Sequence, residues 1–155
     1  MTKAIGFIGL GVMGFPMAGH LSQHNRIAVF NRTKTKSEIW STKHKGTICS
    51  SPADLAKISD VIILCVCNDN DVRDIVTGHQ GLLNNLKPGT IVVDHTTTSA
   101  KLAKEMYELL DSNNVSYIDA PVSGGEVGAQ LGKLSIMAGG NKDAFDQIKS
   151  ILVPY

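Results

Sequence analysis

The feature that most constrains this chain is a glycine-rich turn that follows an apolar run almost at the N-terminus. Residues 4–8 are apolar apart from one glycine, Gly9, Gly11 and Gly14 follow in the spacing G-x-G-x-x-G, and residues 15–24 are helix-compatible. A strand, this turn and a helix, in that order, are the context in which the pattern indicates a dinucleotide site. The first glycine permits the tight turn, the second lets the backbone approach a pyrophosphate, and the third allows close packing of helix on strand. The segment expected to contact the dinucleotide comprises Gly9, Leu10, Gly11, Val12, Met13 and Gly14.

The residues after the next predicted strand, 26–30, bear on which dinucleotide binds. At this point an acidic residue bonds the 2′-hydroxyl of NAD, whereas a nearby arginine accommodates the 2′-phosphate of NADP. The chain has no acid here but reads Asn31, Arg32, Thr33, with two lysines close behind. A short basic run can equally be a solvated loop. Its position nevertheless favours NADP over NAD, with Asn31, Arg32 and Thr33 at the cofactor.

Short apolar runs alternate with helix-compatible segments along the rest of the chain. Residues 61–67 are a continuous apolar run, which suits a central parallel strand covered on both faces. The alternation predicts an α/β fold of the Rossmann type, a doubly wound, mainly parallel sheet with helices on both faces. Ligands of such sheets bind outside the carboxyl ends of the strands, so Val66 and Cys67 are expected at the cofactor. Further strands are predicted at 47–49, 90–94, 115–120 and 133–140, and helices at 37–45, 52–58, 69–77, 100–110, 126–131 and 142–152.

Two polar segments follow predicted strands in the second half of the chain. Among residues 95–99, one hydroxyl can cap the next helix while another faces the nicotinamide. His95 could serve as a general base, but a single loop histidine is more often structural or solvated. Ser123, Gly124 and Gly125 form the second segment, where adjacent glycines expose N–H groups that can hold a carboxylate or phosphate. A flexible turn would explain the glycines but leave Ser123 without a role.

Composition excludes several classes of protein. A chain of 155 residues is long enough for one domain with its own core, and a formal net charge of +1 argues against a nucleic-acid-binding surface. No apolar segment approaches the ~20 residues of a transmembrane helix, and no secretory signal precedes the first strand. Cys49, Cys65 and Cys67 lack the spacing of metal ligands and are expected to be reduced. We therefore expect a cytoplasmic protein that binds no metal, no membrane and no nucleic acid.

Four stretches together resemble the β-hydroxyacid dehydrogenases, a family that includes 3-hydroxyisobutyrate dehydrogenase, tartronate semialdehyde reductase and glyoxylate/succinic semialdehyde reductase. They are residues 9–18, residues 94–97, residues 119–125, and Gly132 with residues 138–140. The resemblance implies that Thr97 contacts the cofactor and that Ser123, Gly124 and Gly125 bind the substrate carboxylate. It also implies that Cys67 stands where relatives often carry proline, and that Asn31, Arg32 and Thr33 belong to the NADP-preferring branch.

The resemblance also implies what residues 1–155 lack. The family places its catalytic lysine in a segment after this domain, followed by an all-helical domain that closes the active site and forms the dimer interface. We therefore expect residues 1–155 to be an NADP-binding domain, with the lysine beyond Tyr155 and no catalytic residue before it. The substrate would be a small hydroxy acid or semialdehyde, the full-length enzyme a homo-oligomer, and the domain alone inactive.

Three alternatives remain open at the level of sequence. A 6-phosphogluconate dehydrogenase-type enzyme shares Asn-Arg-Thr after the second strand and Ser-Gly-Gly-Glu later in the chain. A non-catalytic module could keep the nucleotide fold for sensing or partner recognition. A purely structural Rossmann-like domain would bind neither dinucleotide.

Overall fold

The computed structural model describes residues 2–155, and a six-stranded parallel sheet runs through its centre. The strand order is β3-β2-β1-β4-β5-β6, with each half of the sheet growing outward from the central pair β1 and β4. Successive strands are added toward one edge of the sheet from β1 to β3 and toward the other edge from β4 to β6, while all six strands stay parallel. This strand order is that of doubly wound dinucleotide-binding folds, so the predicted Rossmann-type fold is confirmed. The strands are β1 (Ile5–Ile8), β2 (Ile27–Phe30), β3 (Thr47–Ile48), β4 (Val61–Leu64), β5 (Ile91–Asp94) and β6 (Ser116–Asp119).

The central strands are apolar on both faces because helices cover both faces. Along β1, Phe7 packs into one hydrophobic cluster and its neighbour Ile8 into the other, and Ile63 and Ile62 do the same along β4. All four side chains are at most 1% exposed. This arrangement explains why the strands read as continuous apolar runs rather than as alternating ones.

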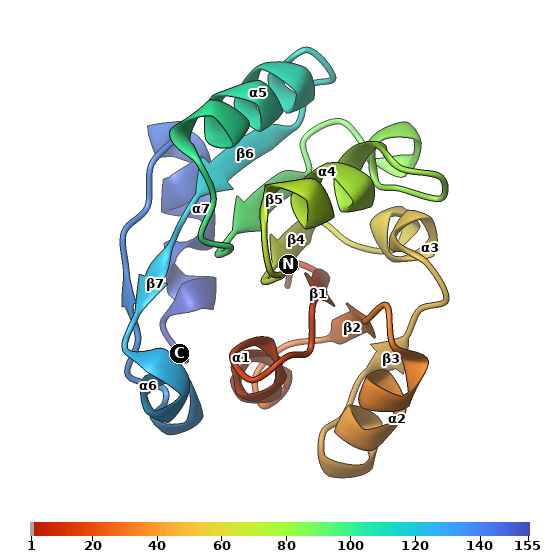
Figure 1. Cartoon of the computed structure of the whole chain (residues 1–155), viewed down its shortest axis with the longest axis vertical. Helices are drawn as coiled ribbons and strands as arrows, with labels where there is room; N and C mark the ends of the chain where they lie inside the picture. Colours follow the sequence, from red (N-terminus) through yellow and green to blue (C-terminus); the bar gives the residue numbers. More distant parts are fainter. Residues whose placement is uncertain (1) are drawn as a thin grey trace.

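Figure 1 shows the two helical layers on either side of the row of strands. Met17 of α1 and Ile148 of α7 belong to the cluster on one face, while Val72 of α4 and Met106 of α5 belong to the cluster on the other. The helices are α1 (Gly14–Ser22), α2 (Lys34–Lys43), α3 (Pro52–Lys57), α4 (Asp69–Thr77), α5 (Ala100–Asp111), α6 (Gly125–Leu131) and α7 (Lys142–Leu152), with a 3₁₀ turn at Leu83–Asn85. Within residues 2–155 no helix combines the length and the apolar character that crossing a membrane requires.

Polar caps set several helix boundaries where the sequence predicts them. Asn68 accepts a hydrogen bond from the backbone of Asp71 at the start of α4, and Asn141 does the same for Ala144 at the start of α7. Ser51 caps α3, with Pro52 in the first turn. The predicted bounds of α4 and α7 are therefore confirmed.

Other boundaries differ from the prediction. Helix α2 begins at Lys34, three residues before the expected start at residue 37, so the basic run is the first turn of a helix rather than a loop. Strand β4 ends at Leu64, because the chain turns outward where residues 65–67 meet the glycine turn. The strand expected over 133–140 contains only β8, Ser135–Ile136.

A small ribbon extends from the β6 edge of the sheet. Strand β7 (Val122–Ser123) pairs antiparallel with β8, and Asp119 and Gly139 exchange backbone hydrogen bonds of 3.0 and 2.7 Å. Figure 1 shows β7 continuing the path of β6 away from the sheet toward α6. The Ser123–Gly125 segment therefore lies on this ribbon and not in the main sheet.

Candidate functional site

A cleft of about 490 Å³ opens at the carboxyl ends of β1, β2 and β4. This is the position at which doubly wound sheets bind their ligands. The cleft contains every residue predicted at the cofactor except Leu10 and Thr97. Its lining includes Gly9, Gly11, Val12, Met13, Gly14, Asn31, Arg32, Thr33, Lys36, Ser51, Cys65, Val66, Cys67, Asp71, Asp74, Ile75 and His79.

The glycine turn has the geometry that its spacing predicts. Gly9 has φ +105°, a backbone conformation that side chains rarely permit, and a Cβ on it would collide with the carbonyl of Cys65. A Cβ on Gly14 would collide with the carbonyl of Gly9, because helix and strand approach so closely. Gly11 differs from both, since a Cβ there would meet no atom within 4 Å. The space beside Gly11 therefore opens to the cleft and leaves its backbone accessible to a ligand.

Three backbone N–H groups of the turn indicate that it could bind an anion. Within residues 2–155, the N–H groups of Gly11, Val12 and Met13 donate to no backbone or side-chain acceptor, although Gly11 itself accepts from Phe15 at 2.9 Å. They lie at the start of α1, where the helix dipole adds positive potential. Consecutive unpaired N–H groups at such a place form an anion-binding concavity.

Asn31 ties the loop after β2 to the glycine turn. Its Oδ1 accepts from the backbone N–H of Leu10 at 2.9 Å, and its Nδ2 donates to the carbonyl of Thr33 at 3.0 Å. The side chain of Leu10 is buried, so this residue contributes its backbone bond and a core contact rather than a cleft surface. Asn31 thereby sets the position of Arg32, which follows it.

Charges of both signs line the cleft beside the end of β2. Arg32 pairs with Asp71 of α4 across the cleft, with Nη1 and Oδ1 separated by 3.6 Å. The arginine side chain is 84% exposed, whereas the aspartate is 19% exposed. Lys36, Asp74 and His79 also line the cleft. Asp71 has no signal in the sequence, because an acid in the first turn of a helix is common and nothing local indicates that it faces Arg32.

A buried carboxylate organises the strand ends beneath the other end of the cleft. Asp94 is fully buried and accepts from the backbone of Thr96 at 2.9 Å and from the hydroxyl of Tyr117 at 2.8 Å. Burial raises the pKa of Asp94, and these hydrogen bonds oppose the shift. The Thr96 hydroxyl accepts in turn from the N–H of Val66 at 3.0 Å. The segment after β4 is therefore held by β5 and β6, a network that sequence reasoning did not predict.

The cysteines and threonine near this point have separate environments. Burial raises the pKa of Cys65 to about 12, so its thiol is un-ionised near neutral pH. Cys67 is exposed at the mouth of the cleft. Thr97 is exposed too, but it lies outside the cleft lining, and Ser99 caps the next helix by accepting from Leu102. Within residues 2–155 the Thr97 hydroxyl has no hydrogen-bond partner, so it is available to a ligand.

His95 is buried in a structural role. It is 2% exposed, its Nδ1–H donates to the carbonyl of Ala120 at 2.6 Å, and its Nε2 accepts from the hydroxyl of Tyr155 at 2.7 Å. Burial lowers the pKa of His95 to about 4, although the bond to Ala120 opposes the shift. The neutral ring joins the end of β5 to the start of the Pro121–Gly125 region and to the last residue of the chain. The structural interpretation thus fits the geometry better than that of a general base.

Ser123, Gly124 and Gly125 lie outside the cofactor cleft. All three are exposed, both glycines have positive φ, and a Cβ on Gly125 would meet no atom within 4 Å. The structure therefore places the two predicted sites on different parts of the domain. Among residues 2–155, no group of three or more His, Cys, Asp or Glu side chains could hold a metal ion.

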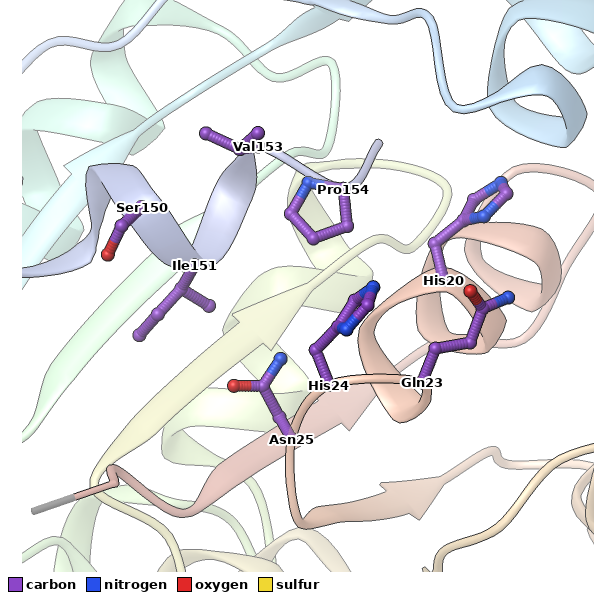
Figure 2. A pocket seen from close by; sticks show the side chains of 8 residues that line it. All are labelled: His20, Gln23, His24, Asn25, Ser150, Ile151, Val153 and Pro154. Atoms are coloured by element: carbon purple, nitrogen blue, oxygen red, sulfur yellow. The ribbon is translucent and has the colours of Figure 1, made fainter.

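A second hollow lies on another side of the domain, between the end of α1 and the end of α7. It measures about 420 Å³, and Figure 2 shows residues of α1 and its following turn on one side, with Val153 and Pro154 on the other. His20 donates from Nε2 to the carbonyl of Ala129 at 2.9 Å, which ties α1 to α6. This hollow shares no lining residue with the cleft at the glycine turn and contains none of the predicted site residues.

Comparison with known proteins agrees with this geometry. The family model for the NAD-binding domain of 6-phosphogluconate dehydrogenase matches residues 4–155. An uncharacterized oxidoreductase of Shewanella frigidimarina is 43% identical over 152 residues, covering 97% of this chain and 52% of the relative. The chain spans about half the length of the curated relatives it matches.

Solved structures also share the fold of this chain. The 3-hydroxyisobutyrate dehydrogenase of Mycobacterium tuberculosis, solved with L-serine, matches with a TM-score of 0.92 and 29% identity over 99% of this chain and 52% of that one. Psf3, solved in complex with NADP⁺ and 2-OPP, matches with a TM-score of 0.92 and 29% identity over 97% of this chain and 54% of that one. The chain belongs to the family of NAD-binding domains typified by that of 6-phosphogluconate dehydrogenase, and its relatives are 3-hydroxyisobutyrate dehydrogenase-like.

Proposed function

We propose that residues 1–155 form the NADP-binding domain of an oxidoreductase that transfers hydride between the nicotinamide and a short 3-hydroxy acid or its semialdehyde. One observation carries this proposal: a single cleft joins three unpaired backbone donors at the glycine turn to an arginine at the end of β2. Anion-binding donors and an arginine are the features that a phosphorylated dinucleotide requires.

The residues of the cleft fit the cofactor in three parts. Gly11, Val12 and Met13 would bind the pyrophosphate through their N–H groups, and the open space beside Gly11 admits it. Arg32 and Thr33 would bind the 2′-phosphate, with Asn31 positioning them. Val66, Cys67 and Thr97 would contact the nicotinamide half, on the strand ends that Asp94 organises. The bound dinucleotide supplies the hydride, while the protein orients it and the substrate.

Ser123, Gly124 and Gly125 would bind the substrate carboxylate. Their exposure leaves the serine hydroxyl and the glycine backbone accessible. The M. tuberculosis relative named above was solved with L-serine, which is itself a 3-hydroxy acid.

The remaining parts of the enzyme would lie in a second domain. Since the chain spans about half of its relatives, we place the proton-donating lysine beyond Tyr155, in an all-helical domain that also forms a homo-oligomer. The domain by itself would bind cofactor and turn nothing over. Reductase activity measured with residues 1–155 alone would contradict this division of roles.

A fluorescence titration with NADPH and NADH tests the cofactor assignment. Arg32→Ala should weaken NADPH binding about ten- to a hundredfold, since a charge-assisted contact to phosphate is lost, and leave NADH binding unchanged. Lys36→Ala is the matched control, because it removes a cation from the same cleft without removing the planar fork. Equal loss of NADH affinity would mean that Arg32 acts on the loop rather than on the phosphate.

A 6-phosphogluconate dehydrogenase-type activity is the second candidate, because the matching family model describes that enzyme's domain. The two candidates differ in substrate. Turnover of 3-hydroxyisobutyrate-type acids by the full-length enzyme would support the first, whereas turnover of phosphorylated sugar acids would support the second. Absence of a lysine motif from the downstream reading frame would favour a non-catalytic binding module over either enzyme.

A further inference from the structure

The cation assigned to the 2′-phosphate already has an anionic partner. Arg32 lies on the wall formed by the segment after β2, Asp71 lies on the opposite wall formed by α4, and their charged atoms are 3.6 Å apart. Among residues 2–155, Arg32 makes no other ion pair or side-chain hydrogen bond. The pair therefore spans the part of the cleft that a 2′-phosphate would enter.

Asp71 is the fixed member of this pair. It occupies the first turn of α4, where its backbone N–H donates to Asn68 Oδ1 at 2.9 Å and the helix dipole stabilises its negative charge. The start of α4 is held in turn by Asp69, whose carboxylate accepts from the backbone and hydroxyl of Ser99 at 3.0 and 2.6 Å. Asp71 is 19% exposed and Arg32 is 84% exposed, so the arginine is the side chain with room to move.

We propose that Asp71 is a specificity-determining residue that lowers the preference for NADP over NAD by competing with the 2′-phosphate for Arg32. This inference rests on the proposed NADP-binding function. To bond the phosphate, the Arg32 fork must leave Asp71, and the phosphate then brings a second negative charge near the same carboxylate. Neither penalty applies to NAD, whose 2′-hydroxyl is uncharged and can donate to a carboxylate.

The direct test is Asp71→Asn, which keeps the size of the side chain and removes its charge. The backbone N–H that bonds Asn68 is unchanged, so α4 keeps its cap. The dissociation constant for NADPH should fall about three- to tenfold, the range expected for releasing one exposed ion pair and its repulsion of phosphate. The dissociation constant for NADH should stay the same or rise.

Two further variants separate competition for Arg32 from a general change of charge. Asp74→Asn removes the same charge from the same helix and the same cleft, at a carboxylate that makes no ion pair with Arg32. It should change NADPH affinity less than twofold. In an Arg32→Ala background, Asp71→Asn should raise NADPH affinity by a smaller factor than in the wild type, because no ion pair with Arg32 is released and only the repulsion between the carboxylate and the phosphate is removed.

The outcomes distinguish this inference from the function on which it rests. If Arg32→Ala weakens NADPH binding but Asp71→Asn behaves like the wild type or like Asp74→Asn, the role of Asp71 is wrong and the NADP assignment stands. If Arg32→Ala leaves NADPH binding unchanged, the role of Asp71 and the assignment of Arg32 to the 2′-phosphate of NADP are both wrong. A gain of the same size with and without Arg32 would also overturn the competition, since the carboxylate would then act on the phosphate alone.

Discussion

Two glycine-containing turns follow strands in this domain, and they are built in opposite ways. The turn after β1 is enclosed by the ends of three strands and by α4, and a Cβ on Gly9 or Gly14 would collide with backbone. The turn after β7 lies on a two-stranded ribbon outside the main sheet, where a Cβ on Gly125 would meet no atom within 4 Å and one on Gly124 would closely approach only the Leu134 side chain, at 3.0 Å. The first turn is thus held by contacts within this chain, whereas the second is an open surface.

The surroundings of the two turns differ as well. Near the second turn, large apolar side chains face solvent: Val127 is 66% exposed, Leu131 61% and Met137 60%. Near the first, Leu10 and Met17 are buried, while Val12, in the turn itself, is 67% exposed and lines the cleft. Residues 2–155 therefore form the walls of the cleft at the first turn, whereas the Ser123–Gly125 segment lies near uncovered apolar side chains. This pattern is expected if residues 1–155 form the proposed cofactor site by themselves and a second domain completes the proposed substrate site.

Alanine at one glycine of each turn should give the largest contrast. Gly9→Ala should lower the free energy of unfolding by about 4 kcal/mol or more, because a side chain there combines a disfavoured φ with a backbone collision. Gly125→Ala, at φ +62° in open space, should cost about 1 kcal/mol. Urea unfolding of both variants measures the contrast. Similar losses at both positions would mean that the two turns are equally embedded in the fold.

Acid should lower the free energy of unfolding through His95, which joins the main sheet to the segment leading to the second turn. His95 joins the end of β5 to Ala120, and its pKa is about 4 in the fold against an ordinary value of 6.5. Between pH 6.5 and pH 4 the imidazole is therefore protonated in the unfolded chain but neutral in the folded chain. The free energy of unfolding falls as pH falls through this range, by up to about 3 kcal/mol. Above pH 6.5 both states are neutral and this contribution is constant.

Urea unfolding between pH 7 and pH 4.5 checks this, with His95→Asn as the comparison. The raised pKa of Asp94 acts in the opposite direction, because the folded chain then binds its proton more readily. Asp94 is present in both proteins, so the difference between them reports on His95. Parallel pH profiles for wild type and variant would show that the histidine does not titrate in this range.

The smallest effect is expected at the exposed turn. Ser123→Ala should change the free energy of unfolding by no more than about 0.5 kcal/mol, since the side chain is exposed and away from caps and core. NADPH affinity should change less than twofold, and only the KM of the full-length enzyme for its hydroxy acid should rise. A large loss of NADPH affinity would instead place Ser123 in the cofactor site and remove the contrast between the turns.

The parts of the molecule that sequence predicts are those encoded locally. The spacing of Gly9, Gly11 and Gly14 predicts the turn from sequence, although only the constraint on Gly14 is local: a Cβ there would meet the carbonyl of Gly9, whereas one on Gly9 would meet that of the distant Cys65. Asn68 and Asn141 mark helix starts because a cap bonds a residue three positions away. These short-range signals are sufficient for the fold class and for ten of the 22 residues that line the cleft.

The remainder depends on pairs of residues far apart in sequence. Asp71 faces Arg32 only because β4 lies beside β1 and carries α4 to the opposite wall of the cleft. Asp94 and Tyr117 meet because β5 and β6 are adjacent, and their separation of 23 residues has no periodic signal. At the early start of α2, the Thr33 carbonyl accepts both from the Asn31 side chain at 3.0 Å and from the N–H of Lys36 at 3.1 Å.

Amide-resolved NMR of residues 1–155 during addition of NADPH tests the central claim, that this domain holds the cofactor site by itself. We expect saturable shifts that are largest at the N–H groups of Gly11, Val12 and Met13, which have no acceptor within the described chain and would bond the pyrophosphate. Absence of saturable shifts at these three amides would contradict it, because a cleft that fits the dinucleotide would then fail to bind it.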